Sequence, residues 1–308
     1  MNINIQNGDC LELMKNIPDG SVDCVLTDPP YFQIRGNFDF VWKSFDEYLE
    51  FVELLAIEFK RVLKPNGSFL WFGDDKNIAY CQIIFDKYFN FLNHLIWDKI
   101  NPINQGEANF RMFATRTERT LYYANTQSKT GLEEIKEDVN NFKSLRDYFE
   151  RVQKFIGTGK NTIIEKIGQK ADHCFRHSST QWDLPTPETY KELIDVFGID
   201  KMEGFREYEA LRRPFNYQLG VYEILRMVNT RNEHHITQKP VFLIQKLIEI
   251  TTNSNQTILD PFMGSGTTGI ACANLNRNFI GFELDPDYFQ IAKKRIDQAQ
   301  TQNNLILI

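Results

Sequence analysis

The sequence lacks several features that would assign a protein to a broad class at once. No apolar run approaches the ~18 residues that a membrane span needs, and the opening MNINIQNGDC has neither the basic nor the apolar stretch of a signal peptide. The five cysteines are an odd number and contain no CxxC pair. This spacing argues against a disulfide framework and against a structural zinc site. We therefore expect a protein of a reducing compartment, with no metal and no membrane partner.

An excess of basic residues is also absent, because 35 Lys and Arg stand against 41 Asp and Glu, for a formal net charge of −6. A nucleic-acid partner would therefore need a local basic patch, since the field of the whole molecule would not attract it. Aromatic residues are plentiful, at 13% with 25 Phe, which fits either a Phe-rich core or a base-stacking surface. The 308 residues suffice for a sizeable core plus an insertion.

Strand-like and helix-like patterns alternate over residues 1–100, and this rhythm predicts a parallel α/β sheet. The expected strands are INIQNGD, VDCVLTD, the end of KPNGSFLWFG, and FLNHLIWDK, and the expected helices are CLELMKNIP, FDEYLEFVELLAIEFKRVL and CQIIFDKYFN. The same rhythm resumes over residues 231–308, from the helix VFLIQKLIEITT onwards. We therefore expect one α/β domain that is interrupted in sequence.

Residues 101–230 have a different character. They begin polar and Asn/Arg-rich, although TLYYA fits one more strand, and helical patterns dominate the insertion at about 143–213. Within it, Arg151 to Ser179 holds six Lys or Arg against two acids. TIIEKIG followed by ADHCFRHSS predicts a helix-turn-helix-like element whose recognition helix lies near Lys170–Ser179. The alternative is an amphipathic insertion that only shapes a cleft.

The segment TILDPFMGSGTTGIACANLNRNFIGFELDPDY is the most informative. One strand ends at Asp260, glycines at 264 and 266 follow, and the next strand ends at Glu283. Such glycines let the backbone approach a ligand, and an acid after the second strand can hold ribose hydroxyls. There is neither a Walker GK[ST] nor a full G-x-G-x-x-G, so an adenosine-containing ligand without pyrophosphate, such as S-adenosylmethionine (AdoMet), fits. The alternative is an ordinary strand-to-helix turn.

A second strand, VDCVLT, ends on Asp28-Pro29-Pro30-Tyr31. In parallel sheets ligands bind at the carboxyl ends of the strands, and the prolines donate no N–H to a ladder. An amine on a planar base needs two acceptors and a flat platform, which the Asp28 carboxylate, the Pro29 carbonyl and the Tyr31 ring could supply. Holding both amine hydrogens favours a pyramidal nitrogen with a free lone pair. The alternative is a strand-ending turn.

TDPPY, LDPFMGSGTT, FIGFELDPDYFQIAKKRI and HITQKPVFLIQKLI together resemble the DNA amino-methyltransferases, which transfer a methyl group from AdoMet to adenine N6 or cytosine N4. The DPPY block precedes the Gly loop, which is the permuted order of the β group, whereas similar ribosomal-RNA and protein-glutamine methyltransferases have the Gly loop first. The resemblance implies a Rossmann-like AdoMet-dependent methyltransferase sheet with helices on both faces. It also implies a catalytic half at 1–100, a target-recognition region at 101–230 and an AdoMet-binding half at 231–308.

Positions that match the family's motifs take their roles from this resemblance. The implied catalytic residues are Asp28, Pro29, Pro30 and Tyr31, and the implied cofactor-binding residues are Asp9, Thr237, Lys239, Asp260, Pro261, Phe262, Gly264, Ser265, Gly266 and Glu283. Asp9 could instead be a helix N-cap, and Lys239 a solvated charge. Candidate DNA contacts are Arg111 and Arg116, near Phe110 and Phe113, with Lys166, Lys170 and Arg176 in the insertion. Solvated surface charges are the alternative there.

We therefore expect a site-specific DNA methyltransferase, of the kind found in restriction-modification systems, that flips its target base into a cleft. TDPPY is more typical of adenine-N6 enzymes, and cytosine N4 is the runner-up. An inactive AdoMet-sensing DNA-binding protein would need a broken motif, and motif order and the insertion disfavour an RNA or protein methyltransferase. The resemblance implies double-stranded DNA as partner in the cytoplasm of a bacterial or phage-infected cell. It leaves open a homodimer and a cognate restriction endonuclease.

Overall fold

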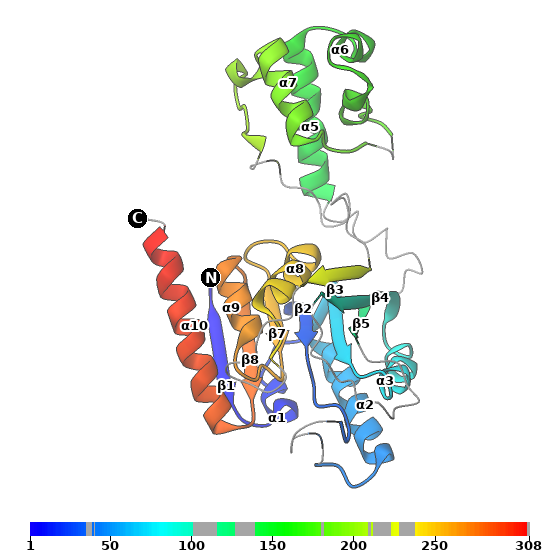
Figure 1. Cartoon of the computed structure of the whole chain (residues 1–308), viewed down its shortest axis with the longest axis vertical. Helices are drawn as coiled ribbons and strands as arrows, with labels where there is room; N and C mark the ends of the chain where they lie inside the picture. Colours follow the sequence, from blue (N-terminus) through cyan, green and yellow to red (C-terminus); the bar gives the residue numbers. More distant parts are fainter. Residues whose placement is uncertain are drawn as a thin grey trace. The chain divides into compact units, whose positions relative to one another are not determined.

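The computed structural model describes residues 1–34, 39, 41–100, 116–126, 139–179, 182–208, 211, 223–227 and 238–306. The chain forms two compact units (Figure 1). The larger one combines Met1–Gly131 with Val221–Ile308, and the smaller one is Leu132–Gly220. Within the described ranges, no helix is long and apolar enough to cross a membrane.

An eight-stranded sheet forms the centre of the larger unit, in the order β1-β8-β7-β2-β3-β5-β4-β6. Its strands are β1 (Ile3–Asn7), β2 (Val22–Thr27), β3 (Leu63–Gly73), β4 (Asn90–Lys99), β5 (Thr117–Ala124), β6 (Ile224–Met227), β7 (Thr257–Asp260) and β8 (Asn278–Glu283). Neighbours are parallel except at β5, which runs antiparallel to β3 and to β4. The strands of residues 1–100 and 231–308 thus run parallel, as expected, and the additional strand at TLYYA is the antiparallel one. β3 and β4 are parallel to each other, and β5 lies between them in the opposite direction.

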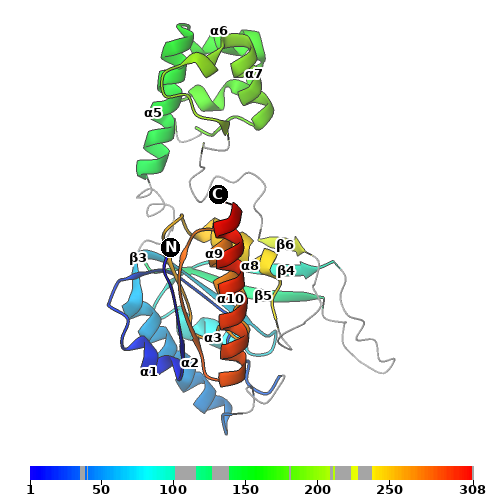
Figure 2. The same cartoon turned by 90° about the vertical axis from the view of Figure 1, so that its left-hand side faces the viewer.

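Helices cover both faces of this sheet, as predicted (Figure 2). One face carries α1 (Cys10–Met14), α2 (Phe45–Val62) and α3 (Ile78–Phe85), and the other carries α8 (Val241–Thr251), α9 (Thr267–Asn274) and α10 (Pro286–Ile306). Alternation along β2 explains the arrangement, because successive side chains point to opposite faces. Val25 packs in the cluster with α1 to α3, while the Cys24 Sγ lies 3.7 Å from the Thr251 Oγ1 of α8.

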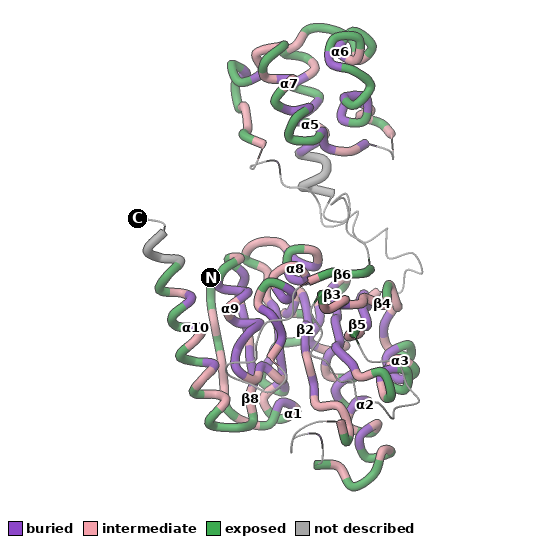
Figure 3. Tube along the Cα trace, viewed as in Figure 1, coloured by how far each residue is buried: buried purple, intermediate pink, exposed green. Residues whose placement is uncertain are grey.

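Part of the abundance of Phe lies in this core. Phe59 of α2, Phe69 of β3 and Phe85 of α3 are fully buried and contact one another or the Trp71 ring. The ring centroids of Phe69 and Phe85 are 4.8 Å apart in a T-shaped arrangement, which aromatic pairs prefer. Buried positions are concentrated on the central strands and on the inward sides of the helices (Figure 3).

The smaller unit has a hydrophobic core of its own. It contains α5 (Val139–Ile156), α6 (Lys160–Ile167) and α7 (Pro187–Phe197), with short 3-10 helices at Gln169–Ala171, His173–Phe175 and Ile199–Lys201. Tyr148, Phe149, Trp182 and Tyr190 are buried together, and the hydroxyls of the two tyrosines lie 2.6 Å apart. Such a core gives the insertion a defined shape.

The recognition helix expected near Lys170–Ser179 is not formed. Gly168, at a φ of +91°, ends α6, and two 3-10 helices follow in place of an α-helix. The Asp172 carboxylate is paired with both Lys160 and Arg176, and the Trp182 indole N–H donates to the Cys174 carbonyl at 2.8 Å. The Trp182 indole takes a backbone carbonyl that a regular helix would use in its own hydrogen bonds, and the segment folds into compact turns.

Candidate active site

Strands from both sequence halves end at one cavity of about 820 Å³ in the larger unit. Its lining includes almost every predicted catalytic and cofactor residue that the structure describes: Asp9, Asp28, Pro29, Pro30, Tyr31, Lys239, Asp260, Pro261, Phe262, Gly264, Ser265 and Glu283. Gly266 does not line it, and Thr237 lies outside the described residues. The turns after β2 and β7 meet here because the two strands are adjacent and parallel, and ligands bind at this edge in such sheets.

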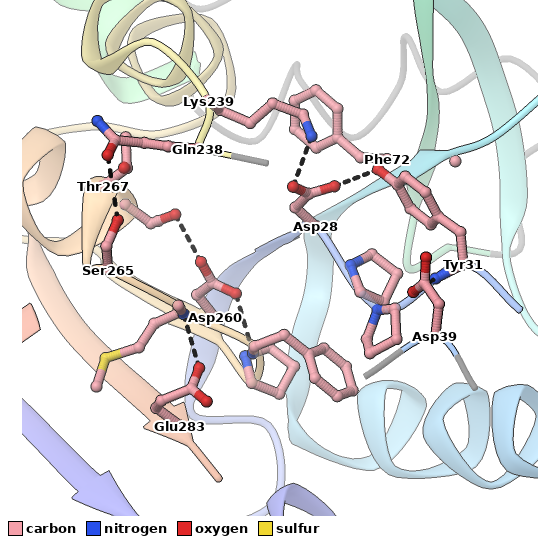
Figure 4. A pocket seen from close by; sticks show the side chains of 18 of the residues that line it. Asp28, Tyr31, Asp39, Phe72, Gln238, Lys239, Asp260, Ser265, Thr267 and Glu283 are labelled. Atoms are coloured by element: carbon pink, nitrogen blue, oxygen red, sulfur yellow. Dashed lines mark hydrogen bonds and ion pairs between the residues drawn. The ribbon is translucent and has the colours of Figure 1, made fainter. Parts of the chain in front are cut away.

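The Asp28 carboxylate lies between two donors (Figure 4). The Tyr31 hydroxyl donates to its Oδ1, and the Lys239 Nζ donates to its Oδ2 at 2.5 Å. The backbone N–H of Tyr31, the first one after the two prolines, donates to the Asp39 carboxylate at 2.6 Å. Burial and then the Asp28 charge raise the pKa of Tyr31 well above its ordinary value. The phenol therefore keeps its proton, and the turn is held in one conformation.

Lys239 is not a solvated charge, because only 7% of its side chain is exposed. Its Nζ also lies 3.3 Å from the Glu118 Oε2, and the Lys99 Nζ lies 2.6 Å from the Glu118 Oε1. Burial alone would lower the pKa of Lys239, but Asp28 and Glu118 raise it above its ordinary value. Burial opposes ionisation of Glu118 too, yet Lys239 and Lys99 lower its pKa. Lys239 and Glu118 therefore both favour their charged forms. Sequence reasoning singles out neither Glu118 nor Lys99.

The Gly loop adopts conformations that favour glycine. Gly264 and Gly266 have φ values of +52° and +83°, in the left-handed region. A Cβ on Gly266 would lie 3.0 Å from Ala292 of α10, so both the dihedral and the close contact disfavour a side chain there. The loop backbone can thus pass close to a ligand in the cavity.

Glu283, at the end of β8, orders this loop. Its Oε2 accepts the Gly264 N–H at 2.9 Å and its Oε1 accepts the Asp285 N–H at 2.8 Å. Burial raises the pKa of Glu283 above its ordinary value, although these hydrogen bonds oppose the shift. Each carboxylate oxygen has acceptor capacity beyond one hydrogen bond, and Glu283 faces the cavity. It can therefore also accept from ligand hydroxyls.

Asp260 is a buried carboxyl that joins the two motifs. Its Oδ1 accepts from the Thr27 hydroxyl at 2.9 Å and from the Phe262 N–H at 3.2 Å, and its Oδ2 accepts from the Thr268 hydroxyl at 2.6 Å. Burial nevertheless raises the pKa of Asp260 to about 7. Thr27 directly precedes Asp28, so this carboxyl ties the end of β2 to the Gly loop.

Asp9 is the N-cap of α1 and also lines the cavity, and its contact with AdoMet stays a prediction. Its carboxylate caps α1 by accepting the Glu12 N–H at 3.1 Å, and it lines the cavity. The N-cap role fixes its orientation, and its second oxygen remains available toward the cavity.

The predicted DNA contacts are engaged within the protein. Lys170 pairs with Glu192 at 2.6 Å, Arg176 pairs with Asp172, and the Lys166 Nζ lies 5.4 Å from the centre of the Phe197 ring. Arg111 lies outside the described residues.

Arg116 pairs with Asp98 at 2.6 Å, and Arg226 pairs with the same carboxylate at 3.1 Å. Arg116 directly precedes Thr117 and Glu118, which line the cavity. Two guanidinium groups thus share one carboxylate beside the candidate active site.

Residues 22–294 match the DNA methylase family, and the chain therefore belongs to this family of N6 and N4 methyltransferases. Among its relatives, the Type II methyltransferase M.HinfI of Haemophilus influenzae is 27% identical over 97% of this chain and 70% of that protein.

Two solved structures show the same fold. The M1.HpyAVI–SAM complex has a TM-score of 0.55 at 24% identity and covers 96% of this chain and 99% of that one. The PvuII DNA methyltransferase, described as cytosine-N4-specific, has a TM-score of 0.57 at 15% identity and covers 100% of this chain and 93% of that one. These matches confirm the predicted methyltransferase sheet.

Proposed function

We propose that this member of the DNA methylase family transfers a methyl group from AdoMet to the N6 amine of adenine in double-stranded DNA. The observation that carries the proposal is the shared cavity, in which the Asp28–Tyr31 turn and the Gly loop after β7 face one ligand space. TDPPY favours adenine within the family, and cytosine N4 is the second candidate.

The cofactor side of the cavity has the donors and acceptors that AdoMet requires. Glu283 would hold the ribose hydroxyls, and the Gly264–Gly266 backbone would lie against the rest of the cofactor. M1.HpyAVI, which shares the fold, was crystallised with this compound. When bound, AdoMet supplies a methyl group on a sulfonium, so the target nitrogen gains that methyl while the electron pair of the broken C–S bond stays on sulfur.

The other side of the cavity would hold the target amine. Its lone pair is conjugated into the base ring, so the nitrogen is a poor nucleophile until its two hydrogens are held out of the ring plane. Asp28 would accept one hydrogen and the Pro29 carbonyl the other, and the carboxylate would stabilise the positive charge that develops on nitrogen. The extra proton then leaves the nitrogen, to Asp28 or to water, and the Tyr31 ring provides a stacking surface for the flipped base.

DNA contacts are supported by local charge in an otherwise acidic protein. Arg116 and Arg226 share Asp98, so this group of three side chains carries one positive charge in excess. Paired guanidinium groups suit phosphate oxygens, and they would position the duplex while the helical insertion contributes further contacts. The homodimer and the cognate endonuclease stay predictions from the resemblance.

Nucleoside mass spectrometry tests the proposal directly. Unmethylated DNA is incubated with AdoMet and either the wild-type protein or Asp28→Ala, and modification-sensitive sequencing then locates the site. N6-methyladenine with the wild-type protein alone is the expected result. N4-methylcytosine would select the second candidate, and the absence of both products would contradict the proposal.

A further inference from the structure

Four charged side chains form a continuous row at the wall of the cavity. The row runs from Asp28 to Lys239 at 2.5 Å, from Lys239 to Glu118 at 3.3 Å, and from Glu118 to Lys99 at 2.6 Å. These residues come from the turn after β2, the turn before α8, β5 and β4 respectively. All four line the cavity. The row thus links the proposed catalytic carboxylate to strands on the far side of the sheet centre.

The surroundings of Lys239 make its burial unfavourable for the stability of the fold. Its Nζ lies 5.1 Å from the centre of the Phe72 ring and 5.9 Å from that of Tyr31. A buried ammonium group loses its hydration, and ion pairs repay that loss only in part. An uncharged pair of side chains of similar shape would stabilise the fold at least equally well. Fold stability therefore does not account for a buried lysine that touches Asp28.

The charges of the row balance, two negative and two positive. Lys239 lies between two carboxylates, so Glu118 competes with Asp28 for the same ammonium group. Without the Lys239 ammonium group, Asp28 would face Glu118 with no cation between the two carboxylates. Without the Glu118 carboxylate, Lys239 would interact with Asp28 alone. Either change alters the charge that Asp28 can present to a target amine, and the two changes act in opposite directions.

We propose that Lys239 and Glu118 are positioning residues that jointly set the orientation and the acceptor strength of Asp28. Lys239 orients the carboxylate, because its ammonium donates to Oδ2. Glu118 draws part of the ammonium charge away, so that Asp28 remains a strong acceptor for the amine. Lys99 neutralises the outer oxygen of Glu118. This inference rests on the proposed methyl transfer, since it assigns the row a role in that reaction.

The groups that face Asp28 determine the expected pH dependence. They are Tyr31 in the same turn, Lys239 before α8, Glu118 of β5 and Asp260 of β7, with Lys99 of β4 behind Glu118. Lys239→Met leaves only acids and a phenol around Asp28, which favours its protonated form. The acid side of the pH–rate profile should then move to higher pH, by about one unit or more for the loss of a charge at this distance.

Glu118→Gln should act the other way. Lys239 then has one carboxylate partner, so the acid side of the profile moves to lower pH or stays low. The rate on the plateau falls about tenfold, because Asp28 accepts less strongly from the amine. The double variant Lys239→Met with Glu118→Gln removes one charge of each sign. The acid side of its pH–rate profile should therefore lie close to that of the wild type. A merely structural role of the row would not produce this restoration.

Single-turnover methyl transfer to target duplex, with saturating enzyme and AdoMet over a pH series, tests these expectations. Lys64→Met is the matched control, because it breaks a 2.8 Å ion pair with Asp23 outside the cavity lining, and its profile should match the wild type. Calorimetry of AdoMet binding and thermal melting accompany each variant. If Lys239→Met does not fold, Lys99→Met provides a second test. It removes the cation that pairs with Glu118, so the acid side of the pH–rate profile should also move to higher pH.

The outcomes separate the two proposals. A wild-type protein that methylates no DNA contradicts the proposed function. A wild type that methylates DNA, combined with Lys239→Met or Lys99→Met profiles that match it, overturns the role of the row. The same holds if the double variant keeps the profile of Lys239→Met, since Glu118 would then have no influence on Asp28.

Discussion

At the level of single residues, Asp28 receives a hydrogen bond on each carboxylate oxygen, from Tyr31 and from Lys239. Each oxygen keeps a further lone pair, so the amine of a base can be accepted without breaking either contact. The turn is therefore organised before the target arrives, and this organisation is what electrostatic catalysis requires.

Asp28→Ala should reduce methyl transfer on the order of a hundredfold or more, in line with the loss of one preorganised group at a reacting centre. AdoMet affinity should change little, because the proposed mechanism assigns the carboxylate to the target amine and not to the cofactor. Radiolabel transfer measures the first and calorimetry the second. Turnover close to that of the wild type would remove Asp28 from the mechanism.

Tyr31→Phe should retain more activity than Tyr31→Ala. The phenylalanine loses one hydrogen bond to the Asp28 carboxylate, worth about 1.5–3 kcal/mol. The alanine also loses base stacking, worth about 1–3 kcal/mol. Single-turnover rates on one duplex make the comparison, and equal losses in both variants would show that the hydroxyl is essential.

Asp260 should make the protein less stable as pH rises. Its pKa of about 7 in the fold exceeds the ~3.9 of an unfolded Asp. The folded state therefore binds the additional proton between these values, and the free energy of unfolding falls through that window. Between pH 5 and pH 8 the loss from this group is on the order of 3 kcal/mol.

Asp260→Asn removes that titration and keeps acceptors for Thr27 and Phe262. Urea unfolding without AdoMet, from pH 5 to pH 8, should show a flatter pH dependence for the variant. Other groups titrate alike in both proteins, so the difference between the curves reports Asp260. Parallel curves would place the carboxyl outside this pH window.

At the level of elements, the turn from β7 into α9 depends on glycine. Gly266 caps α9 with a φ of +83°, and its Cα faces Ala292 of α10. The close packing of α9 on α10 and the shape of the Gly loop thus depend on the same position.

Gly266→Ala should lower the free energy of unfolding by about 2 kcal/mol or more, through backbone strain plus the clash with α10. AdoMet binding should weaken as the loop shifts. Gly20→Ala is the control, because Gly20 also has a positive φ, +60°, but has nothing within 4 Å of the added Cβ. Equal losses in both variants would mean that the packing against Ala292 contributes nothing.

At the level of the whole molecule, the net charge of −6 repels DNA, and binding depends on where the cations lie. Arg116 and Arg226 are 48% and 69% exposed, while Asp98 between them is 17% exposed. The guanidinium groups can therefore reach phosphates while the acid stays behind them.

Replacing Arg116 and Arg226 by Gln should weaken duplex binding and flatten its salt dependence, by about 0.9 in the log–log slope for each phosphate that the variant no longer neutralises. AdoMet affinity should not change. Binding is measured on target and random duplexes across a salt series, with Lys293→Gln plus Lys294→Gln on exposed α10 as the charge-matched control. A slope equal to that of the control would exclude this pair as a phosphate-binding element.

Local sequence patterns were sufficient to predict much of the secondary structure of the larger unit. The apolar spacing of residues 45–62 and the Ser44 cap define α2, and the strands that end at Asp28 and Asp260 were both expected. Because parallel strands end at one edge of a sheet, the two motifs could be predicted to share a site. The motif letters alone also sufficed to place the chain in its family.

The tertiary structure alone decided the charge row, the place of β5 and the turns at 169–175. Lys239 and Asp28 are 211 residues apart in sequence, so the HITQKP block singles out the lysine but not its partner. The sequence around Glu118 does not differ from that around solvated charges. The direction of β5 depends on the gap between β3 and β4, and the 3-10 turns depend on Asp172 and Trp182. The physical reason is the same in each case: local pattern sets which residues can form an element, but burial and pairing across long separations set which charges meet.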